Sequence, residues 1–197
     1  MVNNHEANMR LIFSLLFILV LGGCSSIDVK DYAERSPKLT PEQFFQGKIC
    51  ADGVVRDYSG KQIRSFQARI DASWDDQGVG TLDEVFRFQN EDGSFNNETR
   101  IWTLKPNADG TYQASANDVP VPTTMEYSGN AIHMSYDLEY GEPGDTISLH
   151  MNDWMYQVRE GVVINETRMS KWGIGVGQIL LVMQQVSTDT ICIAQTE

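Results

Sequence analysis

Segments in which apolar and polar residues alternate run through this chain from residue 49 almost to its C-terminus, with turn residues between them. In the clearest segment, residues 132–140, every second residue is apolar, from Ile132 through Tyr136 to Tyr140. Successive side chains of a β-strand point to opposite faces, so such a segment has one buried and one solvent-exposed face. After Phe45 no segment repeats with the helical period of about 3.6 residues. The pattern therefore predicts an all-β domain.

Turn residues divide this pattern into roughly eight to ten strands. The connections are short and rich in Gly, Asp and Asn, as hairpin turns are, which favours a single antiparallel up-and-down β-barrel over a Greek-key sandwich. An outer-membrane barrel is disfavoured because the strands lack a sustained lipid-facing alternation of ~10 residues. The expected strands cover residues 49–55, 62–74, 81–88, 98–104, 111–116, 123–127, 132–140, 147–158, 162–169 and 176–186, with 191–194 as a weaker extension.

The N-terminus has the parts of a secretory signal: Arg10, the apolar residues 11–21, and the small residues Gly22 and Gly23 before Cys24. The apolar run is shorter than the ~20 residues that cross a bilayer as a helix. Its end is similar to a lipobox, in which an aliphatic residue and two small residues precede a cysteine. We expect cleavage between Gly23 and Cys24 and acylation of Cys24, whose acyl chains would anchor the protein to a membrane.

These features divide the chain into a signal peptide over residues 1–23, a polar tether over residues 24–41 and one β-barrel domain over residues 42–197. Within this last part, the sequence from Thr40 to Phe45 predicts a short helical turn, with proline at its first position. Ser25 stands where inner-membrane lipoproteins usually have aspartate. By analogy, the expected location is the bacterial outer membrane, with the protein facing the periplasm.

The chain is acidic, with 27 Asp and Glu against 15 Lys and Arg and a net charge of −12. This charge opposes nucleic-acid binding, and no polybasic patch assists membrane attachment. Acylation of Cys24 would leave Cys50 and Cys192 of the three cysteines. In an oxidising compartment these two form either a disulfide, favoured if a closed barrel brings its first and last strands together, or two separate thiols.

Histidine and methionine occur together twice, as His133-Met134 and His150-Met151. Imidazole and thioether groups are ligands for a soft metal such as Cu(I). Adjacent residues of a strand point to opposite faces, however, so neither pair converges on one ion. We therefore expect neither a metal site nor a cofactor.

The candidate carboxylates for acid–base chemistry form three groups. They are Asp83-Glu84, the pair Asp137 and Glu139 on the exposed face of the 132–140 strand, and Asp153. Asp153 stands at an apparent register shift beside Trp154, as a β-bulge would require. A bulge either aims such a side chain at a site or lets it bond exposed backbone. No catalytic constellation is present, so the sequence predicts no enzyme.

Several blocks of sequence carry a resemblance to a known family. In order they are residues 44–47, 80–84, 100–104, 152–156, 163–165 and 168–174. Together they resemble an uncharacterised family of proteobacterial lipoproteins, defined only as a domain of unknown function, over about Asp31 to Val186. The resemblance implies a single lipocalin-like (calycin-like) barrel without an established activity.

A barrel of about eight strands either fills its interior with side chains or holds one small apolar ligand. The aromatic candidates for core or pocket are Trp74, Trp102, Tyr136, Trp154, Tyr156 and Trp172. The leading hypothesis is a lipoprotein whose barrel binds a fatty-acyl or other apolar molecule at the cell envelope. The alternative is a structural lipoprotein with a solid barrel, which assists an envelope or membrane-lipid-modifying protein partner.

Replacing Cys24 with alanine should remove the site of acylation and release the protein from the membrane fraction. Membrane fractionation and the mass of the N-terminal peptide measure this directly. A variant that stays in the membrane, or a wild-type peptide without added acyl mass, would contradict the expected lipid anchor.

Overall fold

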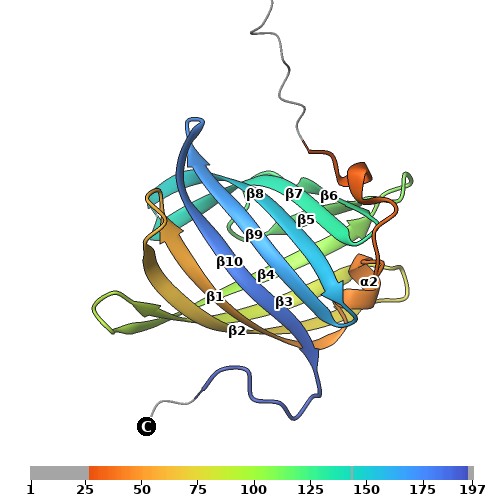
Figure 1. The fold of residues 1–197 in the computed structure, drawn as a ribbon, viewed down its shortest axis with the longest axis horizontal. Helices are drawn as coiled ribbons and strands as arrows, with labels where there is room; N and C mark the ends of the chain where they lie inside the picture. Colours follow the sequence, from red (N-terminus) through yellow and green to blue (C-terminus); the bar gives the residue numbers. More distant parts are fainter. Residues whose placement is uncertain (1–26, 143, 195–197) are drawn as a thin grey trace, which may run out of the picture.

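Ten strands make up most of the described chain, which comprises residues 27–142 and 144–194 of the computed structural model. Strand β1 pairs with β10, every other strand pairs with its sequence neighbours, and the sheet closes into an antiparallel barrel (Figure 1). The predicted all-β, up-and-down antiparallel β-barrel is confirmed. The strands are β1 (Gly47–Asp57), β2 (Gln62–Trp74), β3 (Gly80–Asn90), β4 (Phe95–Pro106), β5 (Tyr112–Ala116), β6 (Thr123–Ser128), β7 (Ala131–Glu142), β8 (Asp145–Arg159), β9 (Val162–Lys171) and β10 (Ile174–Val186).

Within these described ranges, the structure contains no helix of the length and apolar character needed to cross a membrane.

The pairing of β8 departs from the expected strand pattern. A register shift is predicted at Asp153, but this residue pairs in unbroken register with Met134 of β7 and Thr167 of β9. The irregularity lies between Gln157 and Arg159 instead. The prediction of a bulge at Asp153 is wrong because this polar residue continues the series of β8 side chains that face the barrel interior.

A short helix, α2 (Pro41–Phe44), covers one end of the barrel (Figure 1). It is the helical turn predicted for residues 40–45. Phe44 and Phe45 are buried and meet edge to face, with ring centroids 5.2 Å apart. Gln185 of β10 donates from Nε2 to two backbone carbonyls of this segment at 2.8 Å. Aromatic side chains thus plug this end, and the β1–β2, β3–β4, β7–β8 and β9–β10 turns surround the opposite end, here called the mouth.

Residues 27–40 lie against the outer wall of the barrel, where they include the 3-10 helix η2 (Val29–Tyr32). Val29 and Leu39 are buried, and the Leu39 N–H donates to the carbonyl of Gly129 at 2.8 Å. A polar tether is expected over residues 24–41. From residue 27 onward the segment is docked instead, because its apolar side chains gain burial against β6 and β7.

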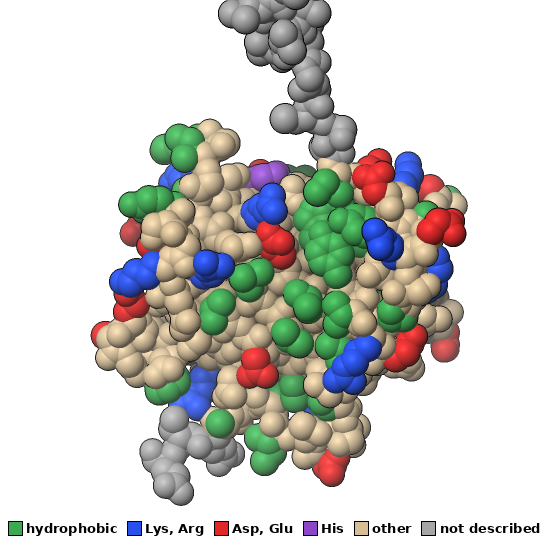
Figure 2. Space-filling model, viewed as in Figure 1, with side chains coloured by type: hydrophobic (Ala, Val, Ile, Leu, Met, Phe, Trp, Pro, Cys, Tyr) green, Lys and Arg blue, Asp and Glu red, His purple; other side chains and the backbone are tan. Residues whose placement is uncertain are grey.

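Aromatic rings fix this docking. The Tyr32 ring lies 5.7 Å from that of Trp154 and 5.4 Å from that of Tyr156, both on β8. Gly129 has φ +58°, and a Cβ at this position would lie 1.6 Å from the Tyr32 carbonyl oxygen, so only glycine fits. Figure 2 shows hydrophobic side chains gathered beside the N-terminal segment, and acidic and basic side chains interspersed over the rest of this face.

Cys50 of β1 and Cys192 of the C-terminal tail form a disulfide, with their Cα atoms 5.0 Å apart. Residues 191–194 form no strand. The tail instead follows the outer surface, where the Ala194 N–H donates to Gln67 Oε1 at 3.0 Å. The disulfide therefore fastens the tail to the strand that closes the barrel.

Replacing Cys50 and Cys192 together with alanine should lower the free energy of unfolding by about 2–5 kcal/mol, because the bond closes a loop across 142 residues. Urea denaturation of the full chain measures the change. Reductant should reproduce the loss in the wild type and leave the double variant unaffected. Equal midpoints for the two proteins would contradict a stabilising disulfide.

Candidate ligand-binding site

The barrel encloses a cavity of about 440 Å³ between the plugged end and the mouth. Inward-facing apolar side chains from both halves of the sheet form most of its lining, among them Phe66, Leu82, Phe86, Met134, Met155 and Leu181. Trp102 of β4 and Tyr136 of β7 also line it and meet edge to face, with ring centroids 5.3 Å apart. The interior is therefore not filled by its own side chains.

Polar side chains interrupt this apolar lining at one level of the barrel and are here called the polar belt. It comprises Glu84 of β3, Arg100 of β4, Asp118 of the β5–β6 loop, Asp153 of β8, and Asn165 and Thr167 of β9. Glu84 and Arg100 are register partners on neighbouring strands. One guanidinium thus shares the belt with three carboxyl groups.

Arg100 and Asp118 form the ion pair of the belt. Arg100 Nε lies 3.0 and 2.8 Å from the two carboxylate oxygens of Asp118, and Nη2 lies 2.7 Å from one of them. Burial alone would lower the pKa of Arg100, but Tyr136, Glu84 and Asp118 outweigh it and raise that pKa. Arg100 therefore stays charged, and Asp118 already occupies two of its three nitrogens.

The loop that carries Asp118 fills a break in strand pairing. The pairing of β5 with β4 begins only at Trp102, and the pairing of β6 with β7 ends at Met134. Nearer the mouth, the Glu139 N–H of β7 donates to the Asp118 carbonyl at 2.9 Å, and the Ile101 N–H of β4 donates to Asn117 Oδ1 at 3.2 Å. The loop thus bridges the two strands and brings Asp118 to the cavity.

Asp153 is satisfied by the strand beside it. Its Oδ1 accepts hydrogen bonds from Asn165 Nδ2 and, at 2.9 Å, from Thr167 Oγ1. Burial raises the pKa of Asp153 to about 6, although these two bonds and Arg100 act in the opposite direction. Asp153 therefore faces the site, but as a regular strand residue and not as part of a bulge.

Glu84 is the belt member without such support. Its side chain is 9% exposed and lines the cavity, and no donor among the described residues hydrogen-bonds to its carboxyl group. Burial raises its pKa to about 7; Arg100 opposes this shift, and the carboxylates of Asp153, Asp118 and Asp83 add to it. Near neutral pH this carboxyl group can therefore both accept and donate a proton in a hydrogen bond.

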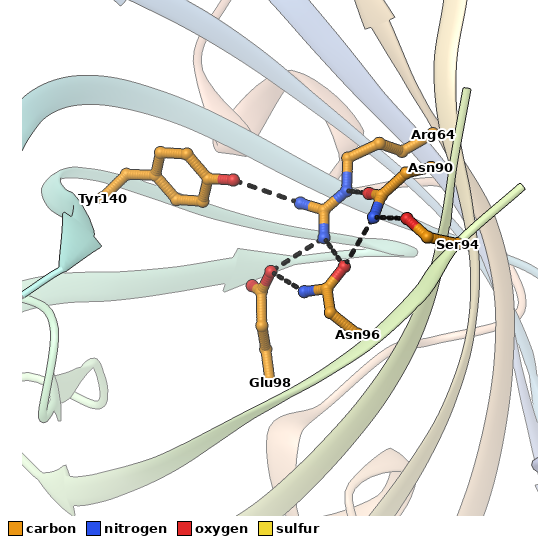
Figure 3. A network of polar contacts seen from close by, with 6 residues as sticks. All are labelled: Arg64, Asn90, Ser94, Asn96, Glu98 and Tyr140. Carbon is orange, nitrogen blue, oxygen red and sulfur yellow. Dashed lines mark hydrogen bonds and ion pairs between the residues drawn. The ribbon is translucent and has the colours of Figure 1, made fainter. Parts of the chain in front are cut away.

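At the mouth, Arg64 of β2 connects four strands (Figure 3). Its guanidinium donates to Asn90 of β3 at 3.0 Å, to Asn96 and Glu98 of β4 at 3.0 and 2.8 Å, and to Tyr140 of β7 at 3.3 Å. These bonds lie where β5 and β6 no longer separate β4 from β7, although β4 still pairs with β3 and β7 with β8. Arg64 thus narrows access to the cavity while keeping its own charge paired with Glu98.

The predicted aromatic residues divide between the two faces of the barrel. Trp102 and Tyr136 line the cavity, whereas Trp74 packs on Tyr112 at the plugged end and donates to the Phe45 carbonyl at 2.7 Å. The remaining three are on the outside. Trp154 and Tyr156 face outward on β8 against the N-terminal segment, and Trp172, 89% exposed, stands in the β9–β10 turn at φ +52°.

The core-or-pocket prediction for Trp154, Tyr156 and Trp172 is therefore corrected. Trp154 and Tyr156 alternate with Asp153 and Met155, and it is the latter pair that faces inward. Trp172 lies in a turn, outside any strand register. Cys24 and Gly23, the predicted lipidation and cleavage residues, lie outside the described residues.

His133 and His150 lie on the outer face of the barrel and do not line the cavity. His133 stacks on Trp154 with ring centroids 4.2 Å apart, and burial lowers its pKa. His150 contacts Asp137 through Nδ1 at 2.8 Å and Ser135 through Nε2 at 3.1 Å. Among residues 27–142 and 144–194, no group of three or more His, Cys, Asp or Glu side chains is placed to hold a metal ion.

Comparison with known proteins identifies the family. Residues 18–185 match the model of DUF3833, described as a protein family of unknown function. The chain belongs to this family. The resemblance of the sequence blocks to a family defined as a domain of unknown function is thereby confirmed. No curated protein matches this DUF3833 chain.

Solved structures share the barrel of this DUF3833 protein. An S-type phycobiliprotein lyase from Guillardia theta superposes with a TM-score of 0.53 at 8% identity, covering 82% of this chain and 99% of that one. A protein of unknown function from the DUF3598 family of Nostoc punctiforme gives a TM-score of 0.53 at 13% identity, covering 77% of this chain and 51% of that one. At these identities the likeness shows the lipocalin-like fold alone.

Sequence reasoning missed Arg100 and the role of Glu84 in the DUF3833 barrel, although the strand alternation carried the signal. Glu84 lies between Leu82 and Phe86 on one face of β3, and Arg100 is two residues before the buried Trp102. A charged residue in register with apolar neighbours faces the same interior as they do. Asp118 had no comparable signal because it lies in a loop.

Replacing Glu84 with glutamine should reduce the pH dependence of stability between about pH 4.5 and 7. The folded state holds the Glu84 proton up to about pH 7 and the unfolded chain only to 4.5, so the free energy of unfolding falls as pH rises through this window. The share of Glu84 is about 3 kcal/mol. The pKa of Asp153 is raised for the same reason to about 6, so Asp153 contributes a comparable slope of its own at somewhat lower pH.

Urea denaturation at several pH values measures this slope. The control is Asp52→Asn, which removes a carboxylate from the exposed face of β1, outside the groups that shift the pKa of Glu84, and should keep the wild-type slope. If Glu84→Gln retained the full slope, the buried carboxyl group would not be its source.

Proposed function

We propose that this protein binds an apolar small molecule in its barrel while an acylated Cys24 anchors it to the outer membrane. The observation that supports binding is the enclosed cavity of about 440 Å³. Ligand sites in proteins have volumes of about 300–1,000 Å³, mostly apolar walls and a few convergent polar groups, and this cavity has all three features. Its volume and apolar lining suit an acyl chain or a molecule of similar size.

The arrangement of the barrel ends supports exchange of a ligand through one route. Helix α2 and the buried Phe44 and Phe45 plug one end, whereas the mouth is bounded by hairpin turns and the Arg64 network. Lys171 and Tyr140 also line the cavity at this end. A ligand would therefore enter between polar side chains and place its apolar part against the deeper Met, Leu and Phe side chains.

The proposed anchor would keep the barrel near a source of apolar molecules. The chain from Val29 onward is fixed to the outer wall through buried contacts, so an acyl group on Cys24 would hold the barrel close to the membrane surface. The alternative of a solid barrel that serves only as an interaction surface is disfavoured, because the interior contains a cavity.

The substitution Ile179→Trp should block ligand uptake. Ile179 of β10 lines the cavity, whereas its neighbour Leu180 faces the outer surface, so Leu180→Trp is the matched control. The probe is N-phenyl-1-naphthylamine, titrated into the full chain in phosphatidylcholine nanodiscs and followed by energy transfer from tryptophan, with empty nanodiscs as the blank.

The wild type and Leu180→Trp should bind one probe per chain, and Ile179→Trp should bind at least about tenfold more weakly, since a bulkier side chain occupies the site. Energy transfer that is absent in the wild type, or equal in all three proteins, would refute binding inside the barrel.

A further inference from the structure

Glu84 has unused hydrogen-bonding capacity inside the barrel. Glu84 is 9% exposed as a residue and lines the cavity, and its carboxyl group receives no hydrogen bond from any residue in the described part of the chain. Buried polar groups in folded proteins are nearly always hydrogen-bonded, because an unmatched one is costly. A carboxyl group left open at a cavity wall is therefore a candidate contact for a bound molecule.

The other charged groups of the belt are already matched. Asp118 engages Nε and Nη2 of Arg100, and Asn165 and Thr167 engage Asp153. A ligand carboxylate would have to displace Asp118 to gain the bidentate face of Arg100. Such a ligand would also stand among the carboxyl groups of Glu84, Asp118 and Asp153, which outnumber the single guanidinium.

We infer that the barrel selects ligands whose polar group is an uncharged or cationic hydrogen-bond donor, an amine or a hydroxyl, received by Glu84, and that it discriminates against free carboxylates. This inference rests on the proposed binding function and specifies the polar end of the ligand. The apolar wall of β10, β1 and β2 faces the belt across the cavity, so an alkyl chain has a separate surface to contact.

The ionisation of Glu84 supports this assignment. Burial raises its pKa to about 7, with Arg100 of β4 opposing and Asp83 of β3, Asp118 of the loop and Asp153 of β8 adding to the shift. A cationic amine would lower this pKa by pairing with the carboxylate. Binding of an alkylamine should therefore strengthen as the pH rises from about 6 to 8, while binding of an alkanol should not.

The test compares octylamine, octanol and octanoate, which share one alkyl chain, by calorimetric titration of the full chain in phosphatidylcholine nanodiscs. Empty nanodiscs correct for partition into lipid. Octylamine and octanol should bind at least about tenfold more tightly than octanoate. The reason is that a hydrogen bond to a charged or buried group contributes a binding free energy of that order. Glu84→Gln should abolish the preference for the amine and its pH dependence. Asp52→Asn, a carboxylate change on the outer face of β1, should alter neither.

The outcomes separate the two proposals. Octanoate binding as tightly as octylamine, or a preference unchanged by Glu84→Gln, would overturn the assignment of Glu84, even where Ile179→Trp shows that the compounds enter the barrel. No binding of any of the three compounds, together with no effect of Ile179→Trp on the naphthylamine probe, would overturn the binding function itself. The comparison in the wild type needs no variant to fold.

Discussion

The pairing of β1 with β10 is the interaction on which the rest of the structure depends. It joins Lys48–Asp57 to Gly177–Val186 and turns a ten-strand meander into a closed barrel. Closure satisfies the backbone groups of both strands and removes the edges of the sheet. It also defines an interior that the sheet separates from the outer surface. The plug at α2, the cavity and the disulfide to the C-terminal tail all depend on this strand pairing.

The interior that closure creates is not optimised for stability alone. Carboxyl groups and a guanidinium occupy wall positions where apolar residues of similar size would pack without any loss of hydration. Asp153 and Arg100 are matched by neighbouring groups, but Glu84 is not. Local departures of this kind from the rules of a stable core are concentrated at functional sites. For this reason the proposed chemical specificity is assigned to the belt and not to the mouth.

The shortness of strands β5 and β6 determines how the barrel wall is built near the mouth. Because these strands cover only the plugged half of the barrel, β4 and β7 continue toward the mouth without each other. The β5–β6 loop and the Arg64 network occupy this interval, one bringing Asp118 to Arg100 and the other linking β2 to Tyr140. Near the mouth, polar side chains therefore connect the parts of the barrel wall that backbone hydrogen bonds do not join.

The sequence by itself determined the strands, their antiparallel order and the helical turn at Pro41, because alternation and turn residues act over a few neighbouring positions. It did not show which residues face the cavity at Asp153, Trp154 and Tyr156, since a polar interior reverses the rule that apolar residues point inward. Only the tertiary structure decided that Cys50 meets Cys192, that Asp118 reaches Arg100 and that Glu84 stays unmatched. These contacts join residues distant in sequence, and their geometry exists only once the barrel has closed.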